Sequence, residues 1–301
     1  MDLPDAQRPE QNPSAAPGPP PARGGPLEPG LYVVSTPIGN LRDITYRAVD
    51  VLAAADLVLA EDTRVTAKLL TACGLSRPLA PYHDHNAEAQ RPKVLARLAE
   101  GERVALVSDA GTPLISDPGF KLVRAAAEAG HAVRAIPGAS APLTALAASG
   151  LPTDRFLFAG FPPPKSVARR RWLEELAETR ATLIVFESGP RLAGSLADMA
   201  AVFGAREAVV ARELTKLFET LYRGRLPDLA ADPALDGPKG EIVVLIAPGE
   251  EAPATELDVE AALTEALTRL GPGEAASEVA RALHLPRRDL YRRALALKGA
   301  E

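Results

Sequence analysis

Short apolar segments alternate with alanine-rich segments of helical pattern from residue 31 onwards, and this alternation constrains the fold more than any other feature. The first series predicts strands at 31–35, 57–60, 79–83, 104–108 and 131–136, separated by helices at 45–54, 64–73, 88–99 and 119–129. Strands that are apolar throughout and are spaced by helices of about ten residues are typical of a parallel sheet covered on both faces. The first half is therefore predicted to be an α/β domain.

A second series of strands follows, with fewer helices between them. It predicts strands at 155–160, 181–187, 207–213, 218–224 and 241–247, and helices at 141–149, 167–178 and 191–203. No helix is expected between the last three strands, so this sheet should be mixed, with an antiparallel portion. We therefore predict two α/β domains, at 30–141 and 142–249, in a chain of 301 residues that is long enough for both.

The two ends of the chain differ from this pattern. Residues 1–29 are rich in Pro, Ala and Gly and have no apolar periodicity, so nothing offsets the entropy cost of ordering them, and we predict a disordered tail. A Pro- and Glu-rich link at 247–256 leads to a purely helical pattern at 257–299. This last segment is expected to form a small helical domain.

The helical segment resembles a helix–turn–helix, with its turn at Leu285 and Pro286. Leu290, Ala294 and Leu297 follow at positions i, i+4 and i+7 of the next helix. Residues at this spacing share one face of a helix, so these three side chains should pack inward.

Composition excludes several classes of protein. The hydrophobic content of 47% and charged content of 24% are those of globular proteins, which excludes wholesale disorder. No stretch approaches the roughly 20 apolar residues that span a bilayer, and the first residues lack the order of a signal peptide. A single cysteine excludes an internal disulfide and a multi-cysteine zinc site. We therefore expect a soluble protein of a reducing cytoplasm without a membrane partner.

The loops after the strands are the expected place for a ligand, because ligands of parallel α/β sheets bind beyond the carboxyl ends of the strands. The first loop, at 36–40, is not GxGxxG, and no GxxxxGK[ST] occurs, which disfavours dinucleotide and nucleoside-triphosphate binding. The loop at 108–119 holds two glycines and two prolines and exceeds the roughly 2–6 residues of a plain connection. A functional loop is predicted there; the alternative is a turn that caps the following helix.

Eight motifs, in their order and spacing, resemble the tetrapyrrole-methylase superfamily: TPIGNLRDIT, AEDTR, HDHN, VSDAGTPLISDPG, PGAS, FESGPR, ARELTK and KGE. More narrowly, they resemble its ribosomal RNA branch, the 16S rRNA cytidine 2′-O-methyltransferases. The resemblance extends from residue 31 to residue 247 and, more weakly, through the helical segment. It implies an α/β fold of two domains of the tetrapyrrole-methylase type, with a cofactor cleft between them and a small C-terminal helical domain.

The resemblance implies S-adenosylmethionine as cofactor. Carried over residue by residue, its contacts are Ile38, Gly39, Ser108, Asp109, Gly111, Thr112, Ser140, Ala141, Ser188, Leu214 and Gly240. Backbone amides and hydroxyls suit the methionine carboxylate, and small apolar residues suit adenine. The resemblance also implies methylation of a cytidine near the decoding centre of 16S ribosomal RNA, within the small subunit, by a homodimer.

A ribose hydroxyl needs an in-line approach to the sulfonium methyl, at about 3 Å, and help in losing its proton. Glu61 and Asp62 are the candidate bases; the alternative is that they cap the helix that follows Thr63. Methyl transfer from a sulfonium can also proceed by positioning and electrostatics, so a dedicated base is not required.

His83 and His85 flank Asp84, a set that could suggest a metal site. Side chains at adjacent positions point in diverging directions, and the sequence has no further histidine cluster that could complete a metal site. We therefore expect contact with RNA or ribose here and no metal, with helix capping as the alternative.

RNA affinity requires phosphate contacts, and the net charge of −5 permits only local basic patches. The candidate cations are Arg64, Arg212 and Lys216 after strands, Lys165, Arg169, Arg170 and Arg171 after three prolines, and Arg287, Arg288, Arg292 and Arg293 in the helical segment. For the two arginine groups, the alternative is the solvated face of a helix.

Two other functions remain open. A tetrapyrrole C-methyltransferase on the same fold would leave the two arginine groups unexplained. A non-catalytic RNA-binding module would have no use for a cofactor cleft.

Overall fold

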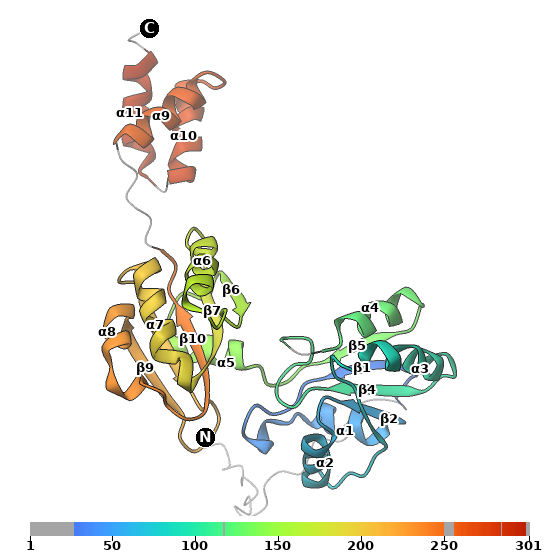
Figure 1. Cartoon of the computed structure of the whole chain (residues 1–301). Coiled ribbons are helices and arrows are strands. Elements are labelled where there is room, and N and C mark those ends of the chain that lie inside the picture. The colour runs from blue at the N-terminus through green and yellow to red at the C-terminus, as the bar shows by residue number, and fades with distance from the viewer. Residues whose placement is uncertain (1–26, 117, 250–255, 284, 299–301) are drawn as a thin grey trace, which may run out of the picture. The chain divides into compact units, whose positions relative to one another are not determined.

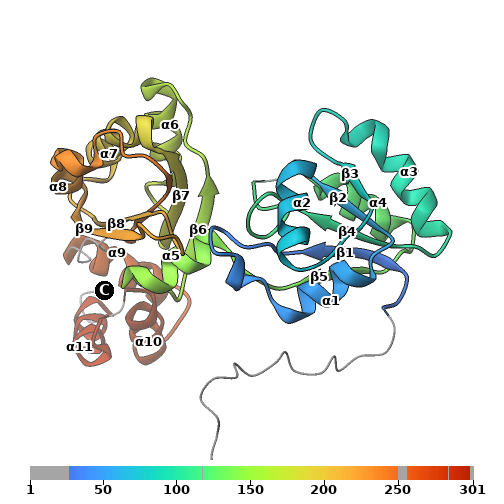
Figure 2. The ribbon, with the colours of Figure 1, turned by 90° about the horizontal axis from the view of Figure 1, so that it is seen from below.

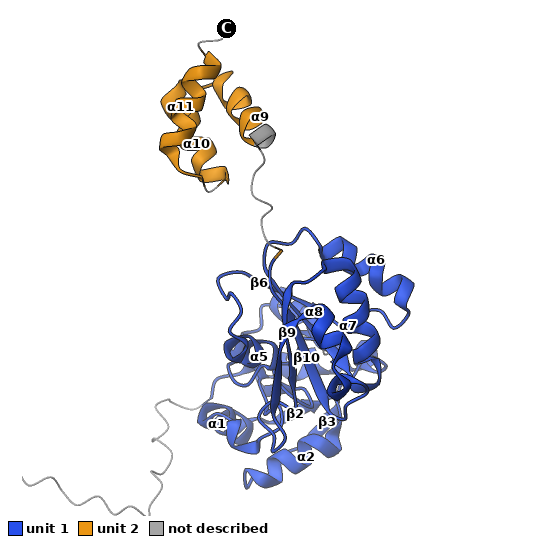
Figure 3. Ribbon diagram, turned by 90° about the vertical axis from the view of Figure 1, so that its left-hand side faces the viewer, with its two compact units in different colours: residues 1–248 blue, residues 249–301 orange. Residues whose placement is uncertain are grey.

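The computed structural model describes residues 27–116, 118–249, 256–283 and 285–298. The chain divides into two compact units, Met1–Pro248 and Gly249–Glu301 (Figure 3). Within the described ranges, no helix is both long enough and apolar enough to cross a bilayer.

Most of the predicted disordered tail at 1–29 lies outside the described residues, but residues 27–29 contact the first sheet. Leu27 packs against its core, and the Tyr32 hydroxyl donates a hydrogen bond to the Glu28 carbonyl at 2.6 Å. Arg134 pairs with the Glu28 carboxylate and donates to the Pro29 carbonyl. The ordered domain therefore begins before residue 30, because this short segment has both an apolar anchor and an ion pair.

The first sheet is parallel throughout, with strand order β3-β2-β4-β1-β5. Its strands are β1 Gly30–Val34, β2 Leu57–Ala60, β3 Leu79–Pro81, β4 Arg103–Val107 and β5 Val133–Ile136. Helices α1 Tyr46–Ala54 and α2 Thr63–Ala72 cover one face, and α3 Ala87–Ala99 and α4 Phe120–Glu128 cover the other (Figure 1). The central strands are buried on both faces, which explains their continuous apolar sequence.

The second sheet is mixed, as predicted, with order β6-β7-β10-β8-β9 and only the β6–β7 pair parallel. Its strands are β6 Phe156–Gly160, β7 Thr182–Ser188, β8 Glu207–Arg212, β9 Thr220–Arg225 and β10 Glu241–Ile246. Helices α6 Ser166–Leu176, α7 Gly189–Phe203 and α8 Leu226–Ala231 lie on one face, and α5 Ala141–Ser149 lies on the other (Figure 2).

The expectation of no helix among the last three strands is wrong for the β9–β10 connection. It contains α8 and the 3₁₀ helix η2 Pro233–Leu235, which bury Leu226, Leu229 and Leu235 in the core of the second sheet. A helix of six residues is shorter than the window of about 11–18 residues over which a helical period can be recognised.

The C-terminal unit consists of α9 Glu256–Leu267, α10 Pro272–Leu283 and α11 Arg287–Lys298. The three helices share one apolar core, in which Leu290 and Ala294 are buried and Leu297 is partly buried. The predicted inward face of α11 is thus confirmed. None of these side chains belongs to the clusters that form the cores of the two sheets.

Because the two units have separate cores, a cavity in one should leave the other intact. Leu290 is 2% exposed, so Leu290→Ala should cost the helical unit about 2–5 kcal/mol. Hydrogen exchange measured by mass spectrometry should then speed up in α9, α10 and α11 and stay unchanged in β1–β10. Leu295→Ala, at a position 48% exposed on the same helix, is the control and should change neither. Faster exchange throughout Met1–Pro248 would show that the units do not fold independently.

Candidate active site

A cavity of about 500 Å³ lies where the loops after the strands of the first sheet meet the second sheet. Nine of the eleven predicted cofactor contacts line it: Ile38, Asp109, Gly111, Thr112, Ser140, Ala141, Ser188, Leu214 and Gly240. The other two, Gly39 and Ser108, line a second cavity of about 350 Å³ that adjoins the first. The sequence-predicted residues, scattered over some 200 positions, are therefore brought together around two adjoining cavities. Both volumes lie in the range of small-molecule sites, about 300–1,000 Å³.

Hydrogen bonds join the loops after β1, β4 and β5 into one wall. Thr36 and Gly111 exchange two backbone hydrogen bonds, of 2.9 and 3.1 Å. The Ser35 and Thr112 hydroxyls lie 3.0 Å apart, and the Thr112 hydroxyl donates to the Ala139 carbonyl at 3.2 Å. This wall holds the backbone of residues 109–112 in a fixed conformation beside the cavity.

Backbone strain is concentrated in two loops of the site. Among the described residues, the non-glycine positions with positive φ are Leu114 and Ser116 after β4, and Glu213 and Thr215 after β8. Each such position costs of order 1–3 kcal/mol and persists only where its surroundings enforce it. Strain of this kind clusters at functional sites, and both loops line the 500 Å³ cavity.

Ile38 connects the first loop with the second sheet. Its side chain is buried among residues that include Leu146 of α5, Leu214 and Val243. The next residue, Gly39, lies so close to Lys216 that a Cβ atom there would be 2.6 Å from the Lys216 Cγ. Only glycine fits this approach without a shift of the lysine.

Asp62 is unsuitable as a base. It caps helix α2 instead, which was the alternative stated above. Its Oδ1 accepts a hydrogen bond from the Arg64 backbone N–H at 2.8 Å and caps α2. The Arg64 guanidinium bonds both carboxylate oxygens, and these hydrogen bonds lower the Asp62 pKa to about 2. Glu61 lines the 500 Å³ cavity, so it is the base candidate that the geometry retains.

The segment that holds His83 and His85 forms the turn that begins α3. The His83 backbone N–H donates to the Asn86 Oδ1, and the Ala87 N–H donates to the His83 carbonyl, both at 2.9 Å. The two imidazole rings lie 6.0 Å apart, and neither lines the two cavities. Throughout the described ranges, no group of three His, Cys, Asp or Glu side chains could hold a metal ion.

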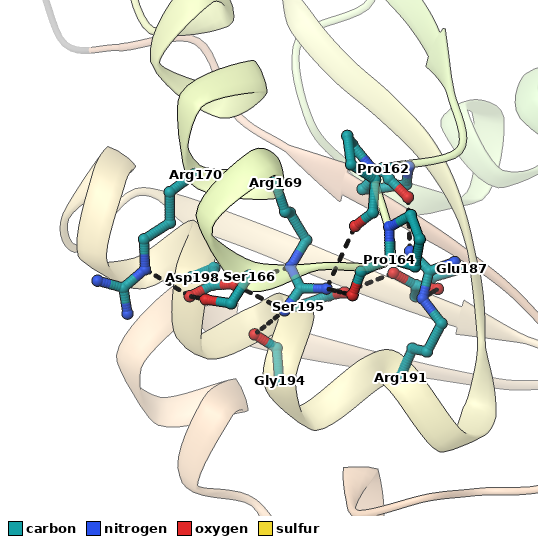
Figure 4. Close-up of polar contacts among 11 residues, drawn as sticks. Pro162, Pro164, Ser166, Arg169, Arg170, Glu187, Arg191, Gly194, Ser195 and Asp198 are labelled. Atoms are coloured by element: carbon teal, nitrogen blue, oxygen red, sulfur yellow. Dashed lines mark hydrogen bonds and ion pairs between the residues drawn. The ribbon is translucent and has the colours of Figure 1, made fainter.

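The prediction that Arg169 contacts RNA is wrong. Its side chain is 7% exposed and pairs with Asp198 of α7 at 2.6 Å (Figure 4). The same guanidinium donates to the Pro163 and Pro164 carbonyls at 3.4 and 3.2 Å. The arginine therefore fixes the proline segment before α6 to α7, and its donors are directed inward rather than to a phosphate.

The neighbouring cations are more accessible. Arg170 also pairs with Asp198, at 2.6 Å, but about half of its side chain is exposed. Lys165 and Arg171 are exposed. Their RNA contacts stay predictions.

Arg212 and Lys216 are held by the second sheet. The Arg212 Nε donates to the Lys239 carbonyl at 2.6 Å, and the Lys216 ammonium lies 2.9 Å from Glu213 and 3.0 Å from Glu241. Burial acts to lower the Lys216 pKa, but the hydrogen bonds to the two carboxylates outweigh it and raise the pKa. The Glu213 pKa is lowered by the same contact with Lys216.

Four arginines of the helical unit are exposed on α11: Arg287, Arg288, Arg292 and Arg293. The Arg287 Nε donates to the Ser277 hydroxyl at 2.7 Å, and Arg292 pairs with Asp289 at 3.0 Å. Exposed pairs of this kind contribute little to stability, about 0–1 kcal/mol, and can open to meet a phosphate.

Phe161, Phe186 and Glu187 also line the 500 Å³ cavity, although none of them is among the predicted cofactor contacts. The strand end at Phe186 and Glu187 belongs to the FESGPR motif and was predicted to close the cleft, whereas Phe161 was not predicted. The Phe186 ring contacts the Phe161 ring at a centroid distance of 5.3 Å. Phe161 directly follows β6, and Phe186 and Glu187 are near the end of β7. The position of Phe161 directly after a strand is the signal that could have identified it.

Glu187 organises the start of α7. Its buried carboxylate accepts hydrogen bonds from the Ser188 N–H at 2.8 Å and from the Ser195 hydroxyl, and lies 3.2 Å from Arg191 (Figure 4). Arg191 in turn donates to the Pro162 carbonyl. Glu187 thus fixes both Ser188 and, through Arg191, the proline segment next to Phe161.

Comparison with known proteins classifies this fold. The family model for Tetrapyrrole (Corrin/Porphyrin) Methylases matches residues 30–230. The chain belongs to this family. A second model, for the RsmI C-terminal HTH domain, matches residues 253–298. The predicted fold, two α/β sheets of the tetrapyrrole-methylase type followed by a helical domain, is confirmed.

Relatives within the tetrapyrrole methylases are similar over nearly the whole chain. The ribosomal RNA small subunit methyltransferase I of Mesorhizobium japonicum is 52% identical over 280 residues, 92% of this chain and 95% of that protein. The protein of the same name from Escherichia coli O157:H7 is 47% identical over 274 residues, 89% of this chain and 96% of that protein.

Several solved structures are similar to about seven-tenths of this chain. The uroporphyrin-III-C-methyltransferase of Thermus thermophilus is 25% identical with a TM-score of 0.52, covering 71% of this chain and 93% of that chain. Diphthine synthase, 16% identical with a TM-score of 0.55, covers 72% and 89% and shares the fold alone. Since the names of the relatives include an RNA and a porphyrin methyltransferase, the fold alone does not define the methyl acceptor.

The buried Arg169–Asp198 pair generates a stability prediction. Asp198→Ala leaves the Arg169 charge buried without its carboxylate, which should cost about 3–5 kcal/mol in urea unfolding. Glu128→Ala breaks an exposed pair with Arg124 and is the control, at about 0–1 kcal/mol. Equal losses in the two variants would contradict the structural role assigned to Arg169.

The Arg169–Asp198 pair also predicts how the stability of the protein depends on pH. Burial acts to raise the Asp198 pKa, but hydrogen bonds from Arg170, Ser166 and Arg169 outweigh it and lower the pKa. A carboxyl whose pKa is lower in the folded state stabilises the protein above its unfolded pKa, about 3.9, and loses that contribution as the pH falls through the folded value. The stability difference between wild type and Asp198→Ala should therefore be full at neutral pH and narrow below about pH 4. A difference that grows on acidification would contradict this sign.

Proposed function

We propose that this chain transfers the methyl group of S-adenosylmethionine to the 2′-hydroxyl of a cytidine in 16S ribosomal RNA, near the decoding centre of the small subunit. One observation carries the proposal: a cavity at the strand ends of a tetrapyrrole-methylase fold occurs in one chain with a helical unit that exposes four arginines on α11. The relatives named ribosomal RNA small subunit methyltransferase I support it, because their similarity extends over both units.

The donor set of the 500 Å³ cavity fits S-adenosylmethionine. Ser140 and Ser188 begin α5 and α7, and neither side chain bonds the N-terminal amides of its helix. These hydroxyls and amides suit the methionine carboxylate, because a helix N-terminus favours negative charge. Apolar contact for the adenine would come from Ile38, Leu214 and Phe186. When bound, the cofactor supplies an electrophilic methyl group.

The protein's contribution to the reaction is then to position the acceptor and to receive a proton. The bound cofactor would supply the methyl group to the ribose oxygen and keep its sulfur as the leaving group, and the hydroxyl would give up its proton. Glu61 lines the cavity and is the carboxylate proposed to accept this proton. The fixed wall of residues 109–112 gives the precise placement on which such a transfer depends.

RNA binding is assigned to exposed cations outside the cavity. Lys165 precedes α6, Arg171 lies in the middle of that helix, and the arginines of α11 lie in the separate helical unit. Positive charge of this kind meets phosphates and releases counterions. The homodimer expected from the resemblance stays a prediction.

The function is tested by mapping ribose methylation on ribosomal RNA from cells that lack the protein. One 2′-O-methylated cytidine of the 16S RNA should lose its methyl group, and the wild-type chain should restore it. An unchanged map would contradict the proposal. Absorbance of a porphyrin or corrin bound to the purified protein would instead support the tetrapyrrole alternative.

Gly111 provides a prediction for cofactor binding. Its φ is +82°, and a Cβ atom there would lie 3.4 Å from the Ile38 Cγ2 at the cavity wall. Gly111→Val should therefore abolish S-adenosylmethionine binding in calorimetry. Gly150→Val is the matched control, because Gly150 has φ +81° and open space around it. Both variants should lose conformational stability, about 1–2 kcal/mol or more, but only the first should lose affinity. Unchanged affinity of folded Gly111→Val would contradict the assignment of the cavity.

The α11 arginines provide a prediction for RNA binding. Replacing Arg287, Arg288, Arg292 and Arg293 with Gln should weaken binding and make it less dependent on salt. The log–log salt slope should fall by about 0.7–0.9 for each arginine that contacts one phosphate. Filter binding of ribosomal RNA over a salt series measures the slope, and calorimetry of the cofactor should show no change. An unchanged slope together with reduced cofactor affinity would make the helical unit a structural brace.

A further inference from the structure

The second cavity, of about 350 Å³, shares Ile38, Asp109, Ala110 and Glu241 with the 500 Å³ cavity. Each of two other cavities shares at most one lining residue with the 500 Å³ cavity. A methyl acceptor must reach the cofactor at about 3 Å, so it has to enter through space that is continuous with the cofactor cavity. The second cavity provides that continuity.

Thr66 supplies a hydrogen-bonding group in this second cavity. Its side chain lines the cavity from α2, is 2% exposed, and has no hydrogen-bond partner for its hydroxyl among the described residues. An unsatisfied buried hydroxyl costs about 1–3 kcal/mol, so its retention calls for a partner that a ligand can provide.

Two large apolar side chains with high exposure line the same cavity. Leu41, in the 3₁₀ helix η1 Leu41–Asp43, is 55% exposed, and Val65, in α2, is 38% exposed. Apolar side chains of this kind offer contact to the flat faces of a nucleobase. Neither side chain belongs to the hydrophobic clusters of the fold, so packing of the core does not account for their apolar character.

Two lysines and two carboxylates, Asp109 and Glu241, complete the lining. Lys68 lies one turn along α2 from Val65, and Lys216 reaches the cavity from the second sheet. Lys216 is bonded to Glu213 and Glu241, so Lys68 is the cation that suits a phosphate group.

We propose that the second cavity is the subsite for the acceptor nucleotide, which leaves the RNA stack to enter it. The pyrimidine base lies against Leu41 and Val65, its polar edge bonds the Thr66 hydroxyl, and its phosphate lies near Lys68. Cytosine presents both donors and acceptors, and a hydroxyl can serve as either. The ribose is then next to the wall that the two cavities share. This assignment rests on the proposed function, since it takes a nucleotide of RNA as the methyl acceptor.

Thr66→Val tests the subsite because it removes the hydroxyl and keeps the shape of the side chain. Thermal stability should stay equal or rise, since an unsatisfied polar group is removed. The Kd of S-adenosylmethionine should be unchanged, while the KM for small-subunit RNA should rise about five- to tenfold, the value of one net hydrogen bond. Thr71→Val is the matched control on the same helix, because the Thr71 hydroxyl is exposed and bonds the Ala67 carbonyl. An unchanged KM in a folded Thr66→Val variant would overturn the subsite.

A binding measurement separates this proposal from the proposed function. Cytidine 5′-monophosphate added to the full chain should shift the methyl NMR signals of Leu41 and Val65, and Thr66→Val should reduce these shifts. If the shifts are absent, or if Thr66→Val leaves them unchanged, the subsite is overturned even where the wild type methylates ribosomal RNA. If the wild type methylates no ribosomal RNA, the proposed function fails, while nucleotide shifts that depend on Thr66 would still support a nucleotide subsite.

Discussion

Two backbone hydrogen bonds between Thr36 and Gly111 hold together the loops from which the site is built. They join the ends of β1 and β4, which are neighbours in the first sheet. Gly111 can make both bonds because it adopts a positive φ that a side chain would resist. From this junction Ser35 and Thr112 extend the wall to the loop after β5, and Ile38 continues from Thr36 into the core of the second sheet. The two cavities depend on this arrangement.

The second sheet supplies the opposite wall, and ion pairs define its conformation. Glu213 and Thr215 keep positive φ in the loop after β8, next to the contact of Lys216 with Glu213 and Glu241. On the other side of the cavity, Glu187 fixes Ser188 through a backbone hydrogen bond. Several charged residues that were predicted to bind the substrate therefore stabilise the conformation of the protein itself.

The two sheets could be predicted from the sequence because each central strand is an uninterrupted apolar run, and the helices between them have enough turns to show a period. The cofactor candidates were implied by the resemblance of eight motifs to a known family, and most of these motifs lie at strand ends, where ligands of parallel α/β sheets bind. Helix α8 could not be predicted, since six residues contain less than two turns. The burial of Arg169 could not be predicted either, because its partner Asp198 lies 29 positions away on another helix and no local pattern connects the two.

The methyl acceptor that we propose is a ribose hydroxyl of small-subunit RNA. The most direct measurement is transfer of a labelled methyl group from S-adenosylmethionine to small ribosomal subunits from cells lacking the protein, followed by digestion of the RNA to nucleosides. We expect the label to appear in 2′-O-methylcytidine alone. Label on a base carbon or nitrogen, or no label in the RNA although the cofactor binds, would contradict it.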